Sequence, residues 1–227
     1  MIYRKDKIVE LSRGKKILHL GFIQHAHLYE QLIKDGNWLH QKLNDVTSEL
    51  IGIDYLEEEV KKIRVQYGYE VYYGDVTKLD EWDYKGIFDI IVCGELIEHI
   101  DNPGLMLDGL KRFMSDQTIL IITTPNPWSR NRLKRVRRVE NEADWLNPEH
   151  TCWFSFQTLK QLLERKGYSE VDYNYFYGET KDEQFHINNS LVNRYLLLKQ
   201  KILKKRIPVQ QYNGLFFQAK LNAENQS

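Results

Sequence analysis

The chain of 227 residues has little cysteine and no long apolar run. Its two cysteines, Cys93 and Cys152, cannot form a disulfide framework or a four-thiolate zinc site, so we expect a reducing, cytoplasmic setting. The longest apolar runs, 90–93 and 119–122, have the length of core strands. A membrane span needs about 18 apolar residues, and a secretory signal needs an apolar segment that residues 1–16 lack. We therefore expect no membrane span and no secretory leader.

The charge is also balanced, because 32 Lys and Arg residues face 32 Asp and Glu residues. A net charge of zero argues against a protein that coats nucleic acid. With 42% hydrophobic and 12% aromatic residues the chain can form a packed core, which excludes a disordered or fibrous protein. We predict a single domain over residues 1–227, with a basic insertion at about 128–150 and an inserted helix at about 188–206.

Apolar strand-like segments alternate with helical patterns over most of the chain. Helical spacing or cap residues predict helices at 29–43, at 56–67, at 103–114 behind Asn102 and Pro103, and after Ser155. Continuous apolar strands between helices indicate a Rossmann-like, doubly wound α/β fold with a mostly parallel sheet. The expected strands are 16–20, 49–53, 70–73, 87–93, 118–123, 170–177 and 212–221.

Such a sheet binds ligands beyond the carboxyl ends of its strands, so the loops there carry the candidate site. Asp54 ends the second strand, where an acid accepts hydrogen bonds from a ribose or caps the following helix. Asp75 follows the third strand, where it can bind an adenine amine or simply form a turn. Position alone favours the ribose role for Asp54, and it leaves the two roles of Asp75 open.

The loop after the first strand is poor in glycine. Only Gly21 remains in the segment 19–27, and no Gly-x-Gly-x-x-Gly motif is present. Because that motif lets the backbone grip a pyrophosphate, its absence counts against a nicotinamide or flavin dinucleotide. A smaller nucleoside without phosphates is compatible with this loop.

The loop after the fourth strand concentrates acidic and imidazole groups. Glu95, Glu98 and His99 fall within five residues at the end of that strand. A histidine there can take a proton from a hydroxyl nucleophile, since its pKa lies near working pH. The competing interpretation is a histidine that holds the loop through its backbone.

Taken together, these segments resemble the class I S-adenosylmethionine-dependent methyltransferases, particularly the small-molecule type of the ubiquinone-biosynthesis O-methyltransferases. No single segment is specific, but their joint order along the chain is. The resemblance implies a seven-stranded sheet whose last strand is antiparallel, and S-adenosylmethionine (SAM) as cofactor. The matching segments are 16–21, Ile51-Gly-Ile-Asp54, Gly74-Asp-Val76, 88–99 with its Gly-Glu-Leu-Ile-Glu-His ending, 119–126, 148–159 and 163–168.

The resemblance also implies roles for individual residues. Gly21 would lie under the methionine part of the cofactor, and Asp54 would hold the ribose hydroxyls. Asp75 and Val76 would frame the adenine. Near the reacting end, Cys93, Gly94 and Glu95 would line the cofactor, while His99 and His150 would face the acceptor pocket as candidate bases.

The first motif departs from the family pattern. An acid usually stands at the position of His19, and glycines stand at those of Ile23 and His25. We expect His25 or Gln24 to contact the methionine carboxylate instead. The departure also leaves an alternative open, a non-catalytic binding module that has lost the cofactor.

Two basic segments bear on partners. Six basic residues between Arg130 and Arg138 form either a solvated helix or a surface for an anionic acceptor such as a phosphorylated sugar, a nucleotide-sugar or a glycan precursor. The helix at 188–206 can pack as a lid, form a homodimer face or rest on an anionic membrane surface. Nucleic acid is disfavoured as a partner.

We expect no metal site, because His25 and His27 lack a third ligand nearby in sequence. The predicted activity is methyl transfer to a hydroxyl of a small polar acceptor.

Overall fold

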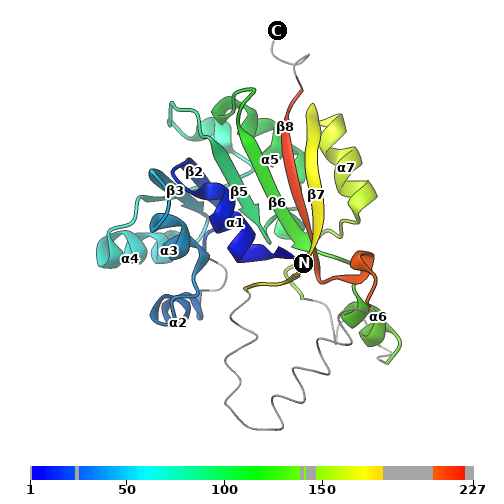
Figure 1. Ribbon diagram of the computed structural model, residues 1–227. Coiled ribbons are helices and arrows are strands. Elements are labelled where there is room, and N and C mark those ends of the chain that lie inside the picture. Colours follow the sequence, from blue (N-terminus) through cyan, green and yellow to red (C-terminus); the bar gives the residue numbers. More distant parts are fainter. Residues whose placement is uncertain (1, 24–25, 139–140, 142–146, 181–206, 223–227) are drawn as a thin grey trace.

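The computed structural model describes residues 2–23, 26–138, 141, 147–180 and 207–222. They form one mixed sheet in the order β1-β7-β8-β6-β5-β2-β3-β4 (Figure 1). Strands β2 to β6 are parallel, and β8 runs antiparallel to both β6 and β7. The strands span Ile2–Tyr3, Lys16–Leu20, Glu49–Asp54, Val71–Tyr73, Ile90–Gly94, Ile119–Pro125, Tyr168–Gly178 and Gly214–Leu221.

Strand side chains alternate between two apolar layers, because successive residues of a strand point to opposite faces. Ile91 and Cys93 pack in the layer under α5 and α7, whereas Ile90 and Val92 pack in the layer under α1 and α3. Burial on both faces explains why these strands read as continuous apolar runs. The predicted Rossmann-like fold with an antiparallel last strand is confirmed.

Helices cover both faces of the sheet. In Figure 1, α1 crosses in front of β5 and β6, while α5 and α7 lie behind. Short 3-10 helices occur at Leu79–Glu81, at Ile97–His99 (η2), at Lys111–Phe113 and at Val209–Gln211. The α-helices are α1 (Arg4–Ser12), α2 (Tyr29–Lys34), α3 (Leu39–Asn44), α4 (Glu57–Tyr67), α5 (Pro103–Leu110), α6 (Arg130–Val136) and α7 (Phe156–Arg165).

Local signals set several helix ends as expected. The Asn102 side chain accepts a hydrogen bond from the backbone N–H of Leu105, and Ser155 forms a capping box with Thr158. The single helix predicted at 29–43 is in fact two helices, α2 and α3. They are separated where Gly36 adopts a left-handed φ of 64°.

The N-terminal elements β1 and α1 are additions that the sequence did not predict. The two-residue β1 pairs in parallel with β7 and extends the seven expected strands to eight. Arg4 and Lys5 of α1 are buried, which is uncommon for charged side chains. The inserted helix expected at 188–206 and most of the insertion beyond residue 138 lie outside the described residues. Within the described part of the chain, no helix has the length and apolarity to cross a membrane.

Candidate active site at the carboxyl edge of the sheet

The loops after β2, β3, β4 and β5 meet at one edge of the sheet. The register places Leu20 beside both Ile53 and Cys93, and Asp54 beside Tyr73. The candidate residues that follow these strands in the sequence are therefore neighbours in space. This edge is at the bottom of Figure 1, where α2 and α6 also lie.

The first loop is held close to the sheet. Gly21 adopts a left-handed φ of 58°, and its N–H donates to the Ile53 carbonyl at 2.8 Å. A Cβ at position 21 would lie 2.7 Å from the Leu96 Cδ1 atom, so only glycine fits without a shift. The Trp38 indole N–H donates to the Phe22 carbonyl at 3.0 Å, which fixes the next residue.

Asp54 joins this loop to the start of α4. One carboxylate oxygen accepts the Ile23 N–H at 2.8 Å, and the other accepts the Leu56 N–H at 3.1 Å. The side chain is only 3% exposed, and burial raises its pKa to about 6 despite these hydrogen bonds. The N-cap residue of α4 is Leu56, and no side-chain cap hydrogen bond forms there, so Asp54 supports the turn before the helix and does not cap it. A ribose contact stays a prediction, and it is chemically open because each carboxylate oxygen can accept more than one hydrogen bond.

Asp75 and Val76 form the loop after β4. The exposed Asp75 carboxylate accepts from the backbone N–H and the hydroxyl of Thr77 at 2.8 and 2.7 Å, which makes it a turn residue. Val76 is buried against the core. Both lie on the expected edge, and their contact with adenine stays a prediction.

His19, at the position where the related sequences have an acid, is fully enclosed. Its Nδ1 atom lies 3.2 Å from Nδ1 of His40 on α3, and the two rings stack. In such a pair one imidazole donates and the other accepts. Burial lowers the pKa of each ring, which favours the neutral form of both. The His19 side chain therefore belongs to the packing under α3.

The end of β5 carries the most strained residue of the site. Glu95 has a φ of 54°, the one left-handed non-glycine residue in the described chain. Its N–H donates to the Thr123 carbonyl at 2.9 Å, and its buried Oε1 atom has no hydrogen-bond partner among the described residues. The Cys93 side chain points into the core toward Met106, so only its backbone can line the site.

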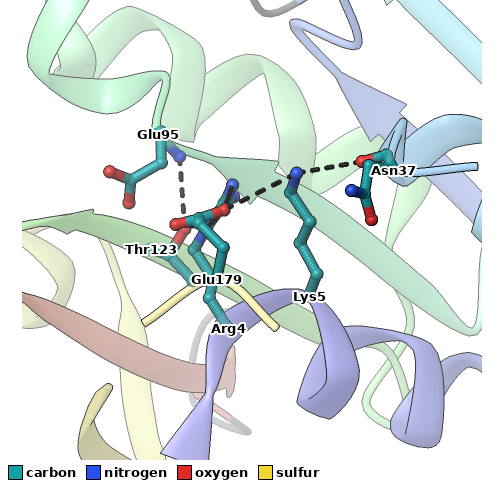
Figure 2. A network of polar contacts seen from close by, with 6 residues as sticks. All are labelled: Arg4, Lys5, Asn37, Glu95, Thr123 and Glu179. Atoms are coloured by element: carbon teal, nitrogen blue, oxygen red, sulfur yellow. Dashed lines mark hydrogen bonds and ion pairs between the residues drawn. The ribbon is translucent and has the colours of Figure 1, made fainter. Parts of the chain in front are cut away.

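Arg4 of α1 reaches over this strand end (Figure 2). Its guanidinium pairs with Glu179, which follows β7, and Lys5 of the same helix donates to the Asn37 carbonyl at 2.9 Å. Arg4 is 1% exposed, and its Nη1 atom has no hydrogen-bond partner in the part of the chain that the structure describes. A Cβ added to Gly94 would lie 3.1 Å from that atom. A buried cationic donor is thus placed directly over Gly94.

Glu98, His99 and His150 come together from two distant segments. The Glu98 carbonyl accepts the N–H groups of Thr151 and Cys152 at 2.9 and 3.1 Å, which brings the His150 loop onto η2. The His99 and His150 rings meet edge to face with centroids 4.6 Å apart. The two predicted acceptor-side histidines therefore do share one place.

The electrostatics of this cluster are dominated by burial. Burial lowers the pKa of His150 to about 4, and neighbouring His99 and Arg132 act in the same direction, so His150 is neutral near pH 7. Burial also raises the pKa of Glu95 and of Glu98, and the negative charge of Glu95 raises that of Glu98 further. Glu95 and Glu98 therefore keep their protons at pH values at which exposed carboxyl groups have lost theirs.

Only part of the basic segment faces this cluster. The Arg132 guanidinium stacks on the Trp153 ring at 3.9 Å, and its charge acts on both Glu95 and Glu98. Lys134, Arg135, Arg137 and Arg138 are exposed, as expected for a solvated helix. Phe154 packs in the core, whereas Trp153 contacts His150.

Sequence reasoning missed Arg4, Glu179 and the Thr124 hydroxyl, which donates to Glu98 at 3.0 Å. No local pattern marks Arg4, because it is one of several charges in an N-terminal segment without a motif. His25 and Gln24, expected to contact the methionine carboxylate, lie outside the described residues, so the His25–His27 pair is not tested.

Comparisons with known proteins identify the family and the fold of this chain. The family model described as a methyltransferase domain matches residues 34–172, which is more than half of the chain. No curated protein sequence matches this chain.

Solved structures share the fold at low sequence identity. A SAM-dependent methyltransferase from Archaeoglobus fulgidus aligns with a TM-score of 0.58 and 19% identity over 95% of this chain and 90% of its own. Magnesium protoporphyrin IX methyltransferase from Synechocystis was solved with bound S-adenosylhomocysteine (SAH). It aligns with a TM-score of 0.55 and 13% identity over 96% of this chain and 82% of its own. The N-methyltransferase NodS from Bradyrhizobium japonicum, also solved with SAH, aligns with a TM-score of 0.54 and 11% identity over 96% of this chain and 85% of its own.

The raised pKa of Asp54 makes a prediction about stability and pH. The folded state favours the acid form of Asp54, so the protonated side chain adds to the free energy of unfolding. This addition is complete below about pH 4 and is lost as the pH rises through about 6. In urea unfolding, the free energy of unfolding of Asp54→Asn relative to wild type should therefore rise by up to about 3 kcal/mol between about pH 4 and 7. The exposed Asp116→Asn is the control and should follow the wild-type curve. A constant difference between Asp54→Asn and wild type would contradict the prediction.

Proposed function

Because this chain belongs to the methyltransferase domain family and is a SAM-dependent methyltransferase, we propose that it methylates a hydroxyl oxygen of a small, anionic acceptor. The acceptor we favour is a phosphorylated sugar, a nucleotide-sugar or a glycan precursor. Membership of this family also favours catalysis over the non-catalytic binding module that the glycine-poor first loop left open.

The observation that carries this proposal is the Glu98–His99–His150 cluster beside Glu95. A hydroxyl is a weak nucleophile until it loses its proton, and imidazole and carboxylate groups are the side chains that serve that purpose. They lie beyond the carboxyl end of β5, at the edge where sheets of this kind bind their ligands. We assign activation of the acceptor hydroxyl to the two histidines of this cluster.

The cofactor supplies an electrophilic methyl group, and the protein has to align the acceptor with it and exclude water. Gly21 allows close approach at the end of β2, and Gly94 and Glu95 border the same space from β5. Asp54 is assigned to the ribose hydroxyls, and Asp75 with Val76 to the adenine.

Arg4 suits the methionine carboxylate of the cofactor. Its Nη1 atom is buried over Gly94 without a hydrogen-bond partner in the described chain, and a carboxylate would satisfy it. This donor would compensate for the missing glycines of the first loop. It comes from a helix that the family resemblance did not include.

Arg132 supports the anionic character of the acceptor. Trp153 holds its guanidinium beside the cluster, and that guanidinium is half-buried, so its charge is screened less than that of the exposed residues of α6. A phosphate placed there would gain charge-assisted hydrogen bonds, and it would break no ion pair that Arg132 forms within the described part of the chain.

Cofactor binding is predicted to depend on Asp54. Asp54→Ala should raise the Kd for SAM and SAH about tenfold or more in calorimetric titration, since hydrogen bonds to a charged group contribute about 1.5–3 kcal/mol. Ser155→Ala, which removes the cap of α7 at a cost of about 1 kcal/mol, should bind both ligands as wild type does. An unchanged Kd for Asp54→Ala would remove this residue from the cofactor site.

The acceptor class is tested with methyl-labelled SAM and a panel of phosphorylated, nucleotide-linked and uncharged sugars. We expect label transfer to an anionic member and release of one SAH for each methyl group. Arg132→Ala should raise the KM for that acceptor about tenfold, because a charge-assisted hydrogen bond is lost. Lys134→Ala, on the exposed side of α6, should leave it unchanged. Labelling of uncharged sugars alone, with Arg132→Ala as active as wild type, would contradict the anionic acceptor.

His99 is predicted to act on turnover and not on cofactor affinity. His99→Ala should lower kcat by about 10²–10⁴ with the labelled acceptor, while calorimetry gives a SAM Kd close to that of wild type. The exposed His27→Ala is the matched control and should retain full turnover. Full turnover in His99→Ala would make His99 structural and leave His150 as the activating residue.

A further inference from the structure

Three potential metal ligands converge at the acceptor side of the site. One side-chain ligand atom each from Glu98, His99 and His150 lies within 4.8 Å of the other two. It is the one such group of three found among the described residues. Glu98 and His99 belong to η2, while His150 comes from the loop before α7.

Two of these ligand groups hold buried atoms without partners. Glu98 is 2% exposed, and its Oε2 atom accepts from the Thr124 hydroxyl, whereas Oε1 has no hydrogen bond within the described chain. The Nδ1 atom of His150 is likewise buried and without a partner there. Leaving such an atom unsatisfied costs about 1–3 kcal/mol, so two in one cluster point to a missing ligand.

The cluster is built by the backbone and does not depend on contacts between its side chains. The Glu98 carbonyl accepts the N–H groups of Thr151 and Cys152, so the residue after His150 is anchored to η2. The Thr124 hydroxyl orients the Glu98 carboxylate from β6. This support resembles the outer hydrogen bonds that orient metal ligands in general.

The charges around the cluster also suit a cation. Glu95 precedes Glu98 by three residues at the end of β5, and its Oε1 atom is buried without a described partner. Of the positive groups that act on these carboxylates, Arg4 is already paired with Glu179, and Arg132 stacks on Trp153. A divalent cation would offset the two buried carboxylates directly.

We propose that Glu98, His99 and His150 bind one divalent transition-metal cation and that the acceptor hydroxyl occupies an open position on it. Two imidazoles and one carboxylate form a donor set that suits zinc, iron and similar cations and leaves positions free. Ligand atoms that share one cation at about 2.0–2.2 Å lie roughly 3–4 Å apart, so the two rings close slightly on binding.

This inference rests on the proposed function only for the identity of the bound hydroxyl. The cation would lower the pKa of that hydroxyl, as it does for metal-bound water, and the proton would pass to solvent water. The resulting oxygen would form the new O–CH3 bond as the S–CH3 bond of SAM breaks, which leaves the ether product and SAH. The two histidines then activate the acceptor as ligands of the cation.

The test is a calorimetric titration of the full chain, without an affinity tag and freed of metal by a chelator, with Zn²⁺ and separately with Co²⁺. We expect one site per chain and visible Co²⁺ absorption bands of a site with nitrogen ligands. His150→Ala and Glu98→Gln should each weaken Zn²⁺ binding at least tenfold and remove those bands. His27→Ala and Cys152→Ser are the matched controls and should bind as wild type does, since neither residue belongs to the cluster.

Circular dichroism and urea unfolding establish that each variant is folded. Equal Zn²⁺ affinity in wild type and in folded His150→Ala would overturn the proposal, as would the absence of binding to wild type. The methyl-transfer assay separates this proposal from the proposed function. Full transfer by chelator-treated protein would contradict the cation but not the acceptor, whereas tight binding without hydroxyl methylation would contradict the acceptor alone.

Discussion

The burial of carboxylates at the end of β5 is the constraint on which the rest of the site depends. Glu95 leaves the strand with a left-handed backbone, and Glu98 follows in η2, so two acidic side chains are enclosed close together. Enclosed negative charge is costly unless positive groups or donors face it. Arg4, Arg132 and Thr124 are the groups that do so; Arg4 comes from α1, which is remote in sequence from β6 and α6, the elements that carry the other two.

The N-terminal helix is therefore part of the site as well as of the fold. Arg4 pairs with Glu179 at the end of β7, and Lys5 binds the segment between α2 and α3, so α1 ties together the two halves of the carboxyl edge (Figure 2). The same helix packs Ile8 into the apolar layer of β2, β5 and β6. Because one short helix buries an apolar residue and two charged residues, it couples the geometry of this edge to the packing of the sheet.

Much of this arrangement could be predicted, and the reasons are local. Alternating apolar strands and helices predicted the fold class, because burial on both faces leaves a pattern in the sequence. Asn102 and Ser155 marked helix starts, because capping uses residues near in sequence. Asp54 and Glu95 were predicted as site residues from their places after strands. The contact of Asp54 with Ile23 could not be predicted, because Ile23 lies in a different loop.

The sequence by itself determined the Rossmann-like topology and the residue types on each loop, since these follow from the order and periodicity of local segments. It also predicted the edge of the sheet at which we place the site. Only the tertiary structure decided which of those residues meet. It buried His19 against His40, turned the Cys93 side chain into the core, and brought His150 onto Glu98 and His99. It also placed Arg4 over Gly94. The physical reason is that these contacts join elements remote in sequence, so their energies depend on packing across the whole sheet and leave no periodic signal in the chain.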